Sequence, residues 1–393
     1  MLRDMWLCLQ PPDTNRPGSV ARHATGAADR LESLDAMRGL TVAGMILVNN
    51  PGSWTEGYPW LAHSAWNGCT LADLVFPSFL LIVGVSIDLS LSRRLAHGAA
   101  GRPLFMALLR RALLLFTLGV LLNGFPAYTP LSTLRLFGVL QRIGLCSLVG
   151  GVLFLTTSGA TQALIAALLL VGYWLALAFV AVPGAGAGVL EPHANLVGWV
   201  DDWLFHGHLY RENFDPEGLL STLPAIATTL IGMLAGRWLR SPVDGRRKTL
   251  GLALAGVALA AAGAVADHWL PINKQLWTSS FVLLAGGAGL VALAGCYWLV
   301  DRRGWRRFSH PFVMLGANAL AVYLLSTMVA RLMELCQVGA GDTCESLRLF
   351  LYERLFEPWA GALTGSLLFA VAYLLVWMVP TTELYRRRLF LRI

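Results

Sequence analysis

The chain has 393 residues, of which 56% are hydrophobic and only 13% are charged. This charged fraction is about half of the roughly 25% that is usual for soluble domains, which argues against a soluble protein. The formal net charge of +7 is explained by where arginines must sit relative to a membrane, so we expect no nucleic-acid partner.

Apolar stretches of about 20 residues, each long enough to cross a lipid bilayer, recur along the chain. They predict an all-α, polytopic bundle of about ten transmembrane helices. The spans are expected at residues 37–50, 70–91, 103–123, 138–156, 161–182, 218–238, 249–266, 276–300, 311–332 and 363–384. Residues 30–393 then form one transmembrane domain. Residues 1–29 never sustain an apolar run, so we expect a disordered cytoplasmic tail without a cleavable signal.

Arginine and lysine residues gather in the connections on one side of this bundle. The positive-inside rule makes that side cytoplasmic and puts both termini there. The opposite side carries three longer connections, at about 51–69, 183–217 and 333–362. The last contains Cys336 and Cys344, which an oxidising periplasm would allow to pair, although two loop thiols are an equal alternative. The cysteines form no CxxC pair and the chain has no HExxH motif, so we expect no metal.

Polar side chains in or beside the spans are the functional candidates, because such a group costs on the order of 2.5–3.5 kcal/mol within a span. The densest cluster runs from Asn49 to Asp73 and includes the string WLAHSAWNGCTLADLVFP. Within it, His63 lies between two tryptophans. An imidazole near a carboxylate is suited to act as a base, whereas a histidine of an interfacial aromatic belt would have the same neighbours. Asp73 needs a partner, such as His63, Arg135 or Arg142.

Five blocks of the sequence carry a family pattern. They are RLESLDAMRGLTVAGMILVNNPGSW (30–54), WLAHSAWNGCTLADLVFP (60–77), LRLFGVLQRIGL (134–145), FDPEGLLSTLPAIATTLIGMLAG (214–236) and INKQLWTSSFVLL (272–284). Together they resemble the heparan-α-glucosaminide N-acetyltransferase family in its bacterial branch, over about residues 30–393. The HSAWNGCTLADLVFP and FDPEGLLST blocks are specific, whereas openings similar to SLDAMRG occur in other membrane families.

The resemblance implies a transmembrane acetyltransferase of the bacterial inner membrane. Such an enzyme takes acetyl-CoA from the cytoplasm and transfers its acetyl group to the amine of an amino sugar, a glucosamine-type residue, on the periplasmic side. The family's histidine falls on His63, as base or transient acetyl carrier, its aspartate on Asp73 and its asparagine on Asn49. Animal members carry a luminal domain before the first shared span, which has no counterpart here. The expected acceptor is therefore a bacterial periplasmic amino sugar or glycan.

Binding residues follow from the chemistry of the two substrates. Coenzyme A carries phosphates, for which arginine is a good ligand, although the positive-inside rule alone also explains the arginines. The candidates are Arg38, Arg110, Arg111, Arg142 and Arg237. Arg142 lies within a span and needs an anionic partner, either coenzyme A or Asp73. The candidates for the acceptor site are Trp60, Trp66, Asn67, Lys274 and Trp277.

Two other functions remain as alternatives. A sugar or amino-sugar transporter is one, because ten spans with intramembrane Asn, Asp and Arg also suit a permease. Its marks would be internal repeats and paired broken helices, and the sequence indicates neither. A related membrane O-acyltransferase differs only in its acceptor. The oligomeric state stays open, with a homodimer as one option.

Overall fold

The computed structural model describes residues 31–99, 101–126, 129–339 and 344–391, so the predicted tail at 1–29 lies outside the described residues. The described chain is mainly helical. Its short antiparallel ribbon, in which Gln337 pairs with Ser346, is formed by β1 (Gln337–Val338) and β2 (Glu345–Ser346). The predicted all-α polytopic class is confirmed.

The helices follow the predicted spans. In chain order they are α3 (Glu32–Asn49), η1 (Ala72–Leu74), α4 (Val75–Ala96), α5 (Arg102–Gly124), α6 (Val139–Thr156), α7 (Gly159–Phe179), α8 (Leu196–Phe205), α9 (Thr222–Arg240), α10 (Gly245–Ala266), α11 (Ser279–Cys296), η2 (Tyr297–Arg302), α12 (Arg306–Ala317), α13 (Ala319–Leu335), α14 (Leu347–Leu355), α15 (Glu357–Ala360) and α16 (Ala362–Arg386). Within the described ranges, eight helices are long and apolar enough to cross a membrane, or nine if the bent pair α12–α13 is one span. The first predicted span corresponds to α3, which is not among them because Glu32, Asp35 and Arg38 lie in its first half. A crossing by α3 stays a prediction.

Short polar side chains start several of these helices. Ser158 accepts a hydrogen bond from the backbone N–H of Thr161 at the start of α7, and Asp244 accepts one from Arg246 at the start of α10. Asn195 does the same for α8, at 2.8 Å from the Gly198 nitrogen. Each cap satisfies a backbone donor that has no partner within the helix, which fixes where the span begins.

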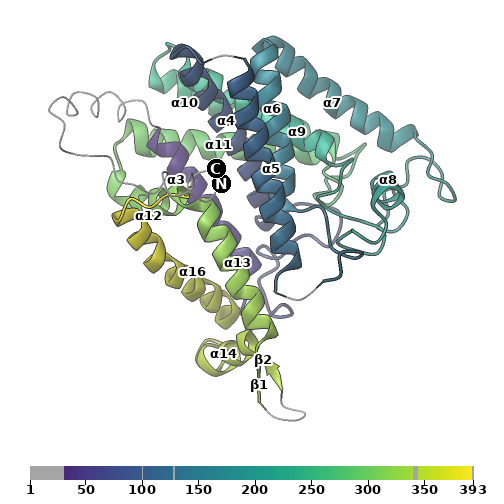
Figure 1. The fold of residues 1–393 in the computed structure, drawn as a ribbon, viewed down its shortest axis with the longest axis vertical. Coiled ribbons are helices and arrows are strands. Elements are labelled where there is room, and N and C mark those ends of the chain that lie inside the picture. Colours follow the sequence, from purple (N-terminus) through teal and green to yellow (C-terminus); the bar gives the residue numbers. More distant parts are fainter. Residues whose placement is uncertain (1–30, 100, 127–128, 340–343, 392–393) are drawn as a thin grey trace.

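Two groups of helices lie on either side of α3 (Figure 1). On one side, α4 packs against α9, α5 against α6, and α10 against α11. On the other side, α12, α13 and α16 pack against α3. The contact between α4 and α9 is close, because a Cβ at Gly84 would lie 2.0 Å from the Thr229 carbonyl oxygen. Small residues let membrane helices approach in this way.

The ninth predicted span is a broken helix. α12 and α13 meet at Asn318 and are bent by 72°, which is a break that the sequence did not indicate. The paired broken helices expected of a transporter would need a second such break. A Cβ at Gly39 of α3 would lie 1.7 Å from the Phe312 carbonyl oxygen, and one at Gly316 would lie 2.0 Å from the Asp35 carbonyl oxygen. This backbone contact ties α12 to α3, and α13 leaves the break in another direction.

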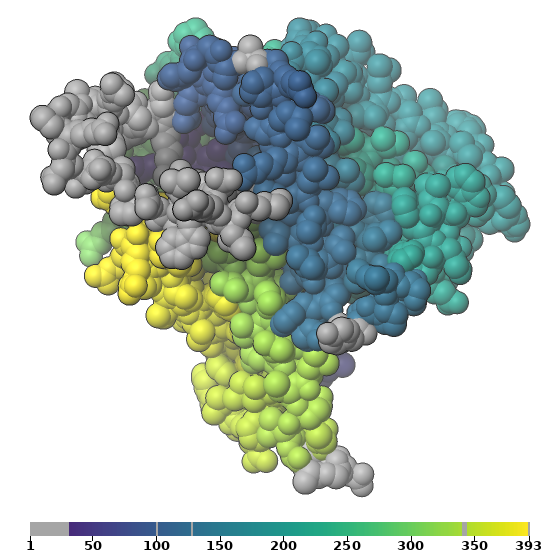
Figure 2. Space-filling model, in the orientation of Figure 1, coloured from purple at the N-terminus to yellow at the C-terminus, as the bar shows by residue number. Residues whose placement is uncertain are grey.

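The third long connection forms the narrow lower end of the molecule, coloured yellow-green in Figure 2. It contains the β1–β2 ribbon, α14 and α15. Cys336 and Cys344 are free thiols in this structure, so the disulfide alternative is not realised.

In the second long connection, at about 183–217, His206 contacts Asp202 and His208 contacts the Leu134 carbonyl oxygen.

Candidate active site

His63, Asp73 and Lys274 meet at one end of the bundle. His63 comes from the loop before η1, Asp73 from η1, and Lys274 from the turn before α11. His63 Nδ1 lies 2.8 Å from Asp73 Oδ1, and Lys274 Nζ lies 3.2 Å from the same oxygen. Lys274 Nζ is also 2.9 Å from His63 Nδ1 and 3.5 Å from Nε2. The three groups thus form one compact triad.

Asp73 organises this triad from a fully buried position. Its second oxygen, Oδ2, accepts hydrogen bonds from the backbone N–H of Ser64 at 3.1 Å and of Thr70 at 3.0 Å, and from the Thr70 hydroxyl at 3.1 Å. A carboxylate with this many donors is held ionised and rigid. With the ring proton on Nδ1, both Nδ1–H and the ammonium donate to Oδ1. This leaves Nε2 of His63, whose side chain is 45% exposed, as the acceptor that faces a ligand.

The loop that carries His63 is tied to the turn that carries Lys274. The Gly68 backbone N–H donates to the Ile272 carbonyl at 2.7 Å, and Asn273 Nδ2 donates to Asn67 Oδ1 at 3.1 Å. Gln275 Nε2 donates to the Ala65 carbonyl at 3.0 Å. Asn67, predicted to bind the acceptor, instead joins the two segments. These bonds bring together blocks that are about 200 residues apart in the sequence.

A cavity of about 960 Å³ leads away from the triad. Along α4 its lining runs from Val75 in the first turn to Arg94 in the last. That is a length of roughly 28 Å at 1.5 Å per residue, close to the ~30 Å of a bilayer's hydrocarbon core. This cavity is called the central cavity below.

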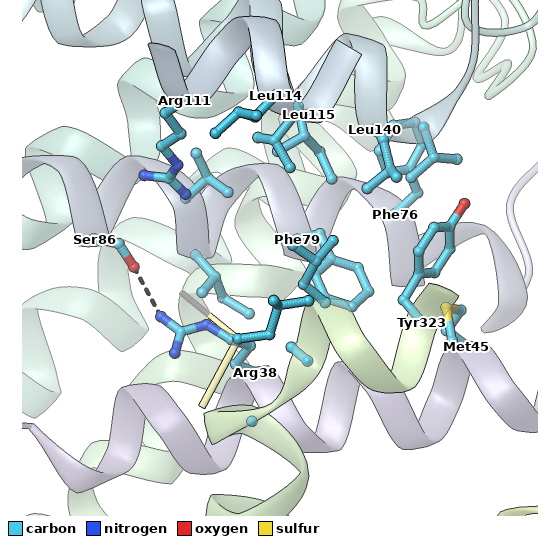
Figure 3. Close-up of a pocket in the computed structure, with 18 of the residues that line it drawn as sticks. Arg38, Met45, Phe76, Phe79, Ser86, Arg111, Leu114, Leu115, Leu140 and Tyr323 are labelled. Atoms are coloured by element: carbon cyan, nitrogen blue, oxygen red, sulfur yellow. Dashed lines mark hydrogen bonds between the residues drawn. The ribbon is translucent and has the colours of Figure 1, made fainter. Parts of the chain in front are cut away.

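The two ends of the central cavity differ in character. The far end contains a cluster of arginines, which are Arg38, Arg93, Arg94, Arg110 and Arg111. Figure 3 shows Arg38 and Arg111 at this end, with Arg38 bonded to Ser86 at 3.0 Å, and Tyr323 with Met45 at the other end. Apolar side chains, among them Phe79 and Leu115, lie between them. Three of the predicted coenzyme A ligands, Arg38, Arg110 and Arg111, therefore line one cavity that also reaches His63.

A second cavity of about 570 Å³, called the outer cavity below, opens on the other side of His63. The residues that line both cavities mark the junction between them, and they are Met45, Asn49, His63, Val139, Glu217, Lys274 and Tyr323. Asn49 and Lys274 are predicted site residues that the structure brings to this junction. Trp277, another predicted residue, lines the outer cavity, and its ring packs edge-on against Phe76.

Glu217 and Tyr323 were not predicted as site residues. Glu217 follows Asp215 in the FDPEG block, and both carboxylates bind Arg135. Burial raises the pKa of the Glu217 carboxyl, but the Arg135 and Arg142 guanidiniums outweigh it and hold the pKa below its usual range. The specific FDPEGLLST block was a usable signal for Glu217, and the position of Tyr323 as a polar residue within the ninth predicted span was one for Tyr323.

Besides Asn67, four predicted residues of the described chain line neither of these cavities. Arg142 is fully buried, with its guanidinium over the Trp277 ring and bonded to the Gly218 carbonyl and the Ser221 hydroxyl. Asp73 is therefore not its partner. Trp66 donates from its indole N–H to the Leu190 carbonyl, and Trp60 is 49% exposed. Arg237 lies against Gly159. The structure does not bring these four side chains to the junction.

No group of three or more His, Cys, Asp or Glu residues in the described part of the chain is arranged to hold a metal ion. The chemistry available at the junction is instead that of a base with an orienting carboxylate, an ammonium and an amide. Such a set can deprotonate a nucleophile and stabilise an oxyanion.

A family model described as heparan-alpha-glucosaminide N-acetyltransferase, catalytic, matches residues 30–272. This chain belongs to that family. The mouse heparan-alpha-glucosaminide N-acetyltransferase is 32% identical over 357 residues, which cover 76% of this chain and 53% of the mouse protein. The human protein of the same name is 31% identical over 353 residues, covering 75% and 52%. The chain thus spans about half the length of these curated relatives.

The predicted membership of the heparan-alpha-glucosaminide N-acetyltransferase family is therefore confirmed. His63, Asp73 and Glu217 lie inside the region that the family model matches, whereas Lys274 lies just beyond its end. The junction between the two cavities thus combines both parts of the chain.

Proposed function

We propose that this protein transfers an acetyl group from acetyl-CoA to the amine of an amino sugar. One observation carries the proposal: a single cavity connects a cluster of five arginines with His63, and a second cavity meets it at His63. A donor and an acceptor entering from opposite ends would meet at the only place where both can contact the imidazole. The names of the curated relatives supply the reaction class.

The central cavity suits the donor. Acetyl-CoA combines phosphates with a long, less polar arm that ends in the thioester. Arginine binds phosphate with two parallel hydrogen bonds, and a cluster of arginines also attracts the anion over a distance. Arg111 is well suited to this role, because its Nε is buried without a hydrogen-bond partner among the described residues. The thioester arm would follow the apolar lining past Phe79 to the junction.

The reaction needs a base, because an amine at neutral pH is largely protonated. In the proposed step, the bound ammonium first releases one proton to water, the nitrogen of the neutral amine attacks the thioester carbon, and His63 Nε2 accepts the second proton from that nitrogen. The C–N bond forms, the C–S bond breaks, and the thiolate of coenzyme A takes the proton from His63. Asn49 and Lys274 would donate hydrogen bonds to the oxyanion that forms between these events. Asp73 keeps the ring oriented throughout, through its hydrogen bond with Nδ1.

The sidedness follows from the arginines. The arginine-rich end of the cavity is assigned to the cytoplasm by the positive-inside rule, and acetyl-CoA is a cytoplasmic metabolite. The outer cavity, with the acceptor, would then face the periplasm of a bacterium whose inner membrane holds the protein. An amino sugar with a glucosamine-type amine is the proposed acceptor class.

The test is transfer of labelled acetyl from acetyl-CoA to glucosamine by the purified protein and by its His63→Ala variant. We expect activity from the unchanged protein, and a loss of roughly 100- to 10,000-fold in the variant with acetyl-CoA binding retained. Transfer by the variant at the level of the unchanged protein would remove His63 from the mechanism. A labelled acetyl group on His63 after mixing with acetyl-CoA alone would indicate the route through an acetylated histidine.

Oriented proteoliposomes test the sidedness and the transporter alternative together. The break between α12 and α13 is a feature that transporters also use, which is why uptake is measured in the same vesicles. The proposal expects acetylation only when acetyl-CoA is on the arginine-rich side and glucosamine on the other. Uptake of unmodified glucosamine without acetyl-CoA would favour a transporter instead.

A further inference from the structure

Glu217 occupies a distinctive position in the candidate active site. It is the one carboxylate among the described residues that line both cavities, and its side chain is 15% exposed. His63 and Lys274 line the same junction. A group that enters from the outer cavity and moves toward His63 therefore passes Glu217.

The charge around Glu217 is not fully balanced by its direct partner. Arg135 donates from Nε to Asp215 Oδ2 at 2.8 Å and from Nη2 to Asp215 Oδ1 at 2.6 Å, which is a bidentate pair. The same Nη2 donates to Glu217 Oε2 at 2.6 Å. One guanidinium thus serves two carboxylates. Arg142, whose charge also acts on Glu217, donates from Nη2 to the Gly218 carbonyl and the Ser221 hydroxyl and makes no hydrogen bond to Glu217 among the described residues.

Asp215 is fully occupied by these and other contacts. Its side chain is completely buried, and it also accepts hydrogen bonds from the backbone N–H of Tyr210 and of Glu217. Asp215 and Arg135 therefore act as the support, and Glu217 is the member of the group that faces the cavities. A carboxylate held ionised at the edge of a cavity is a binding site for a cation.

We infer that Glu217 binds the ammonium group of the acceptor at the junction of the two cavities, and so selects an amine over a hydroxyl. This inference rests on the proposed acetyl transfer. An amino sugar arrives protonated, so the carboxylate attracts the group that has to react and brings it beside His63. Lys274 lines the same junction, and its positive charge favours the neutral, reactive form of the bound amine.

The same contact explains how the product would leave. Acetylation turns the ammonium into a neutral amide, which has no charge for Glu217 to hold. Binding that includes a charged group contributes more than a neutral hydrogen bond, so the amine should bind at the junction better than its N-acetyl product. Glu217 would thus discriminate substrate from product as well as amine from hydroxyl.

The experiment compares glucosamine with N-acetylglucosamine in the wild-type protein and in Glu217→Gln. The variant keeps the size of the side chain and removes its charge. We expect the KM for glucosamine to rise roughly 10- to 100-fold, while the inhibition constant of N-acetylglucosamine and the dissociation constant of acetyl-CoA stay as they were. Glu217→Asp, which keeps the charge on a shorter side chain, should recover part of the loss in KM.

Glu334→Gln is the matched control, because Glu334 also lines the outer cavity but lies away from the junction and pairs with Arg348. It should affect glucosamine and N-acetylglucosamine equally. A Glu217→Gln protein that weakens both sugars equally, or that loses acetyl-CoA binding, would overturn the inference and make Glu217 a structural partner of Arg135. If the wild-type protein acetylates no amine at all, the proposed function fails, whereas normal glucosamine kinetics in Glu217→Gln defeat only this inference.

Discussion

The two ends of the central cavity differ in how their charged groups are balanced. At the His63 end, the buried Asp73 has five donors, which come from His63, Lys274, Ser64 and, twice, Thr70. At the far end, five arginines line the cavity together with a single described carboxylate, that of Asp35. Paired charges hold a geometry in place, whereas an excess of one sign attracts a ligand of the opposite sign.

The difference suggests that the His63 end carries out the chemical step and that the arginine end recognises the donor. A chemical step needs groups fixed before the substrate arrives, and the triad meets that need through hydrogen bonds to its own loops. Recognition of a phosphorylated donor needs a strong field and ligands that can adjust, and a group of arginines supplies both. Removing a paired charge should therefore lower the rate of the reaction, and removing an arginine should lower the affinity for the donor.

The largest effect is expected from Asp73→Asn. The substitution keeps the shape of the side chain but removes the charge that both Nδ1–H and the Lys274 ammonium contact, so the ring loses its fixed orientation. We expect kcat for acetyl transfer to fall roughly 100- to 10,000-fold, with the KM for acetyl-CoA almost unchanged. Steady-state kinetics on the purified variant measure both. A parallel loss of acetyl-CoA binding would mean that Asp73 shapes the cavity instead of serving the chemistry.

The opposite pattern is expected from Arg111→Gln. Loss of one charged hydrogen-bond donor at the arginine end should raise the KM for acetyl-CoA by roughly 10-fold, with kcat close to that of the wild-type protein. The effect should shrink as salt is added, because salt screens the field of the remaining arginines. Arg237→Gln is the control, since Arg237 lines neither cavity. Equal changes in the KM for acetyl-CoA in both variants would mean that the arginines lining the cavity do not bind the donor specifically.

The sequence predicted the parts of this molecule that depend on local patterns. Each predicted span falls on helical structure, the ninth on the bent pair α12–α13, because runs of apolar residues and polar caps such as Ser158 act over short distances. The pairing of His63 with Asp73 was also predictable, since both residues lie in one short segment. The structure brings them to 2.8 Å.

What the sequence did not predict depends on contacts between distant segments. Glu217 reaches the junction only because Arg135, 82 residues before it, holds its carboxylate. Arg142 was assigned to a ligand because a charge within a span needs a partner, but its partners are a carbonyl, a hydroxyl and the Trp277 ring. The glycine contacts that pack α12 on α3 next to the break at Asn318 join two distant segments, and no pattern in either helix reveals them alone.

One acid near the His63 end departs from the rule that charges there are paired. Asp201 of α8 accepts a hydrogen bond at Oδ1 from the Leu219 backbone N–H at 2.9 Å, but its Oδ2 is buried without a hydrogen-bond partner among the described residues. Burial raises the pKa of this carboxyl from 3.8 to about 7. The side chain supports the loop of Glu217, since a Cβ at Gly218 would lie 1.7 Å from Oδ2.

The smallest expected effect is on stability, and it comes from this carboxyl. Between about pH 4 and pH 7 the folded protein keeps a proton that the unfolded chain has lost, so the stabilisation is complete below this window and disappears as the pH rises through about 7. The melting temperature in detergent should therefore be lower at pH 8 than at pH 5.5, with Asp201 contributing about 2 kcal/mol to the difference. Asp201→Asn imitates the protonated acid at every pH, so it should raise the melting temperature at both pH values, and more at pH 8 than at pH 5.5. An equal shift at both pH values would mean that Asp201 is charged throughout and that burial does not raise its pKa.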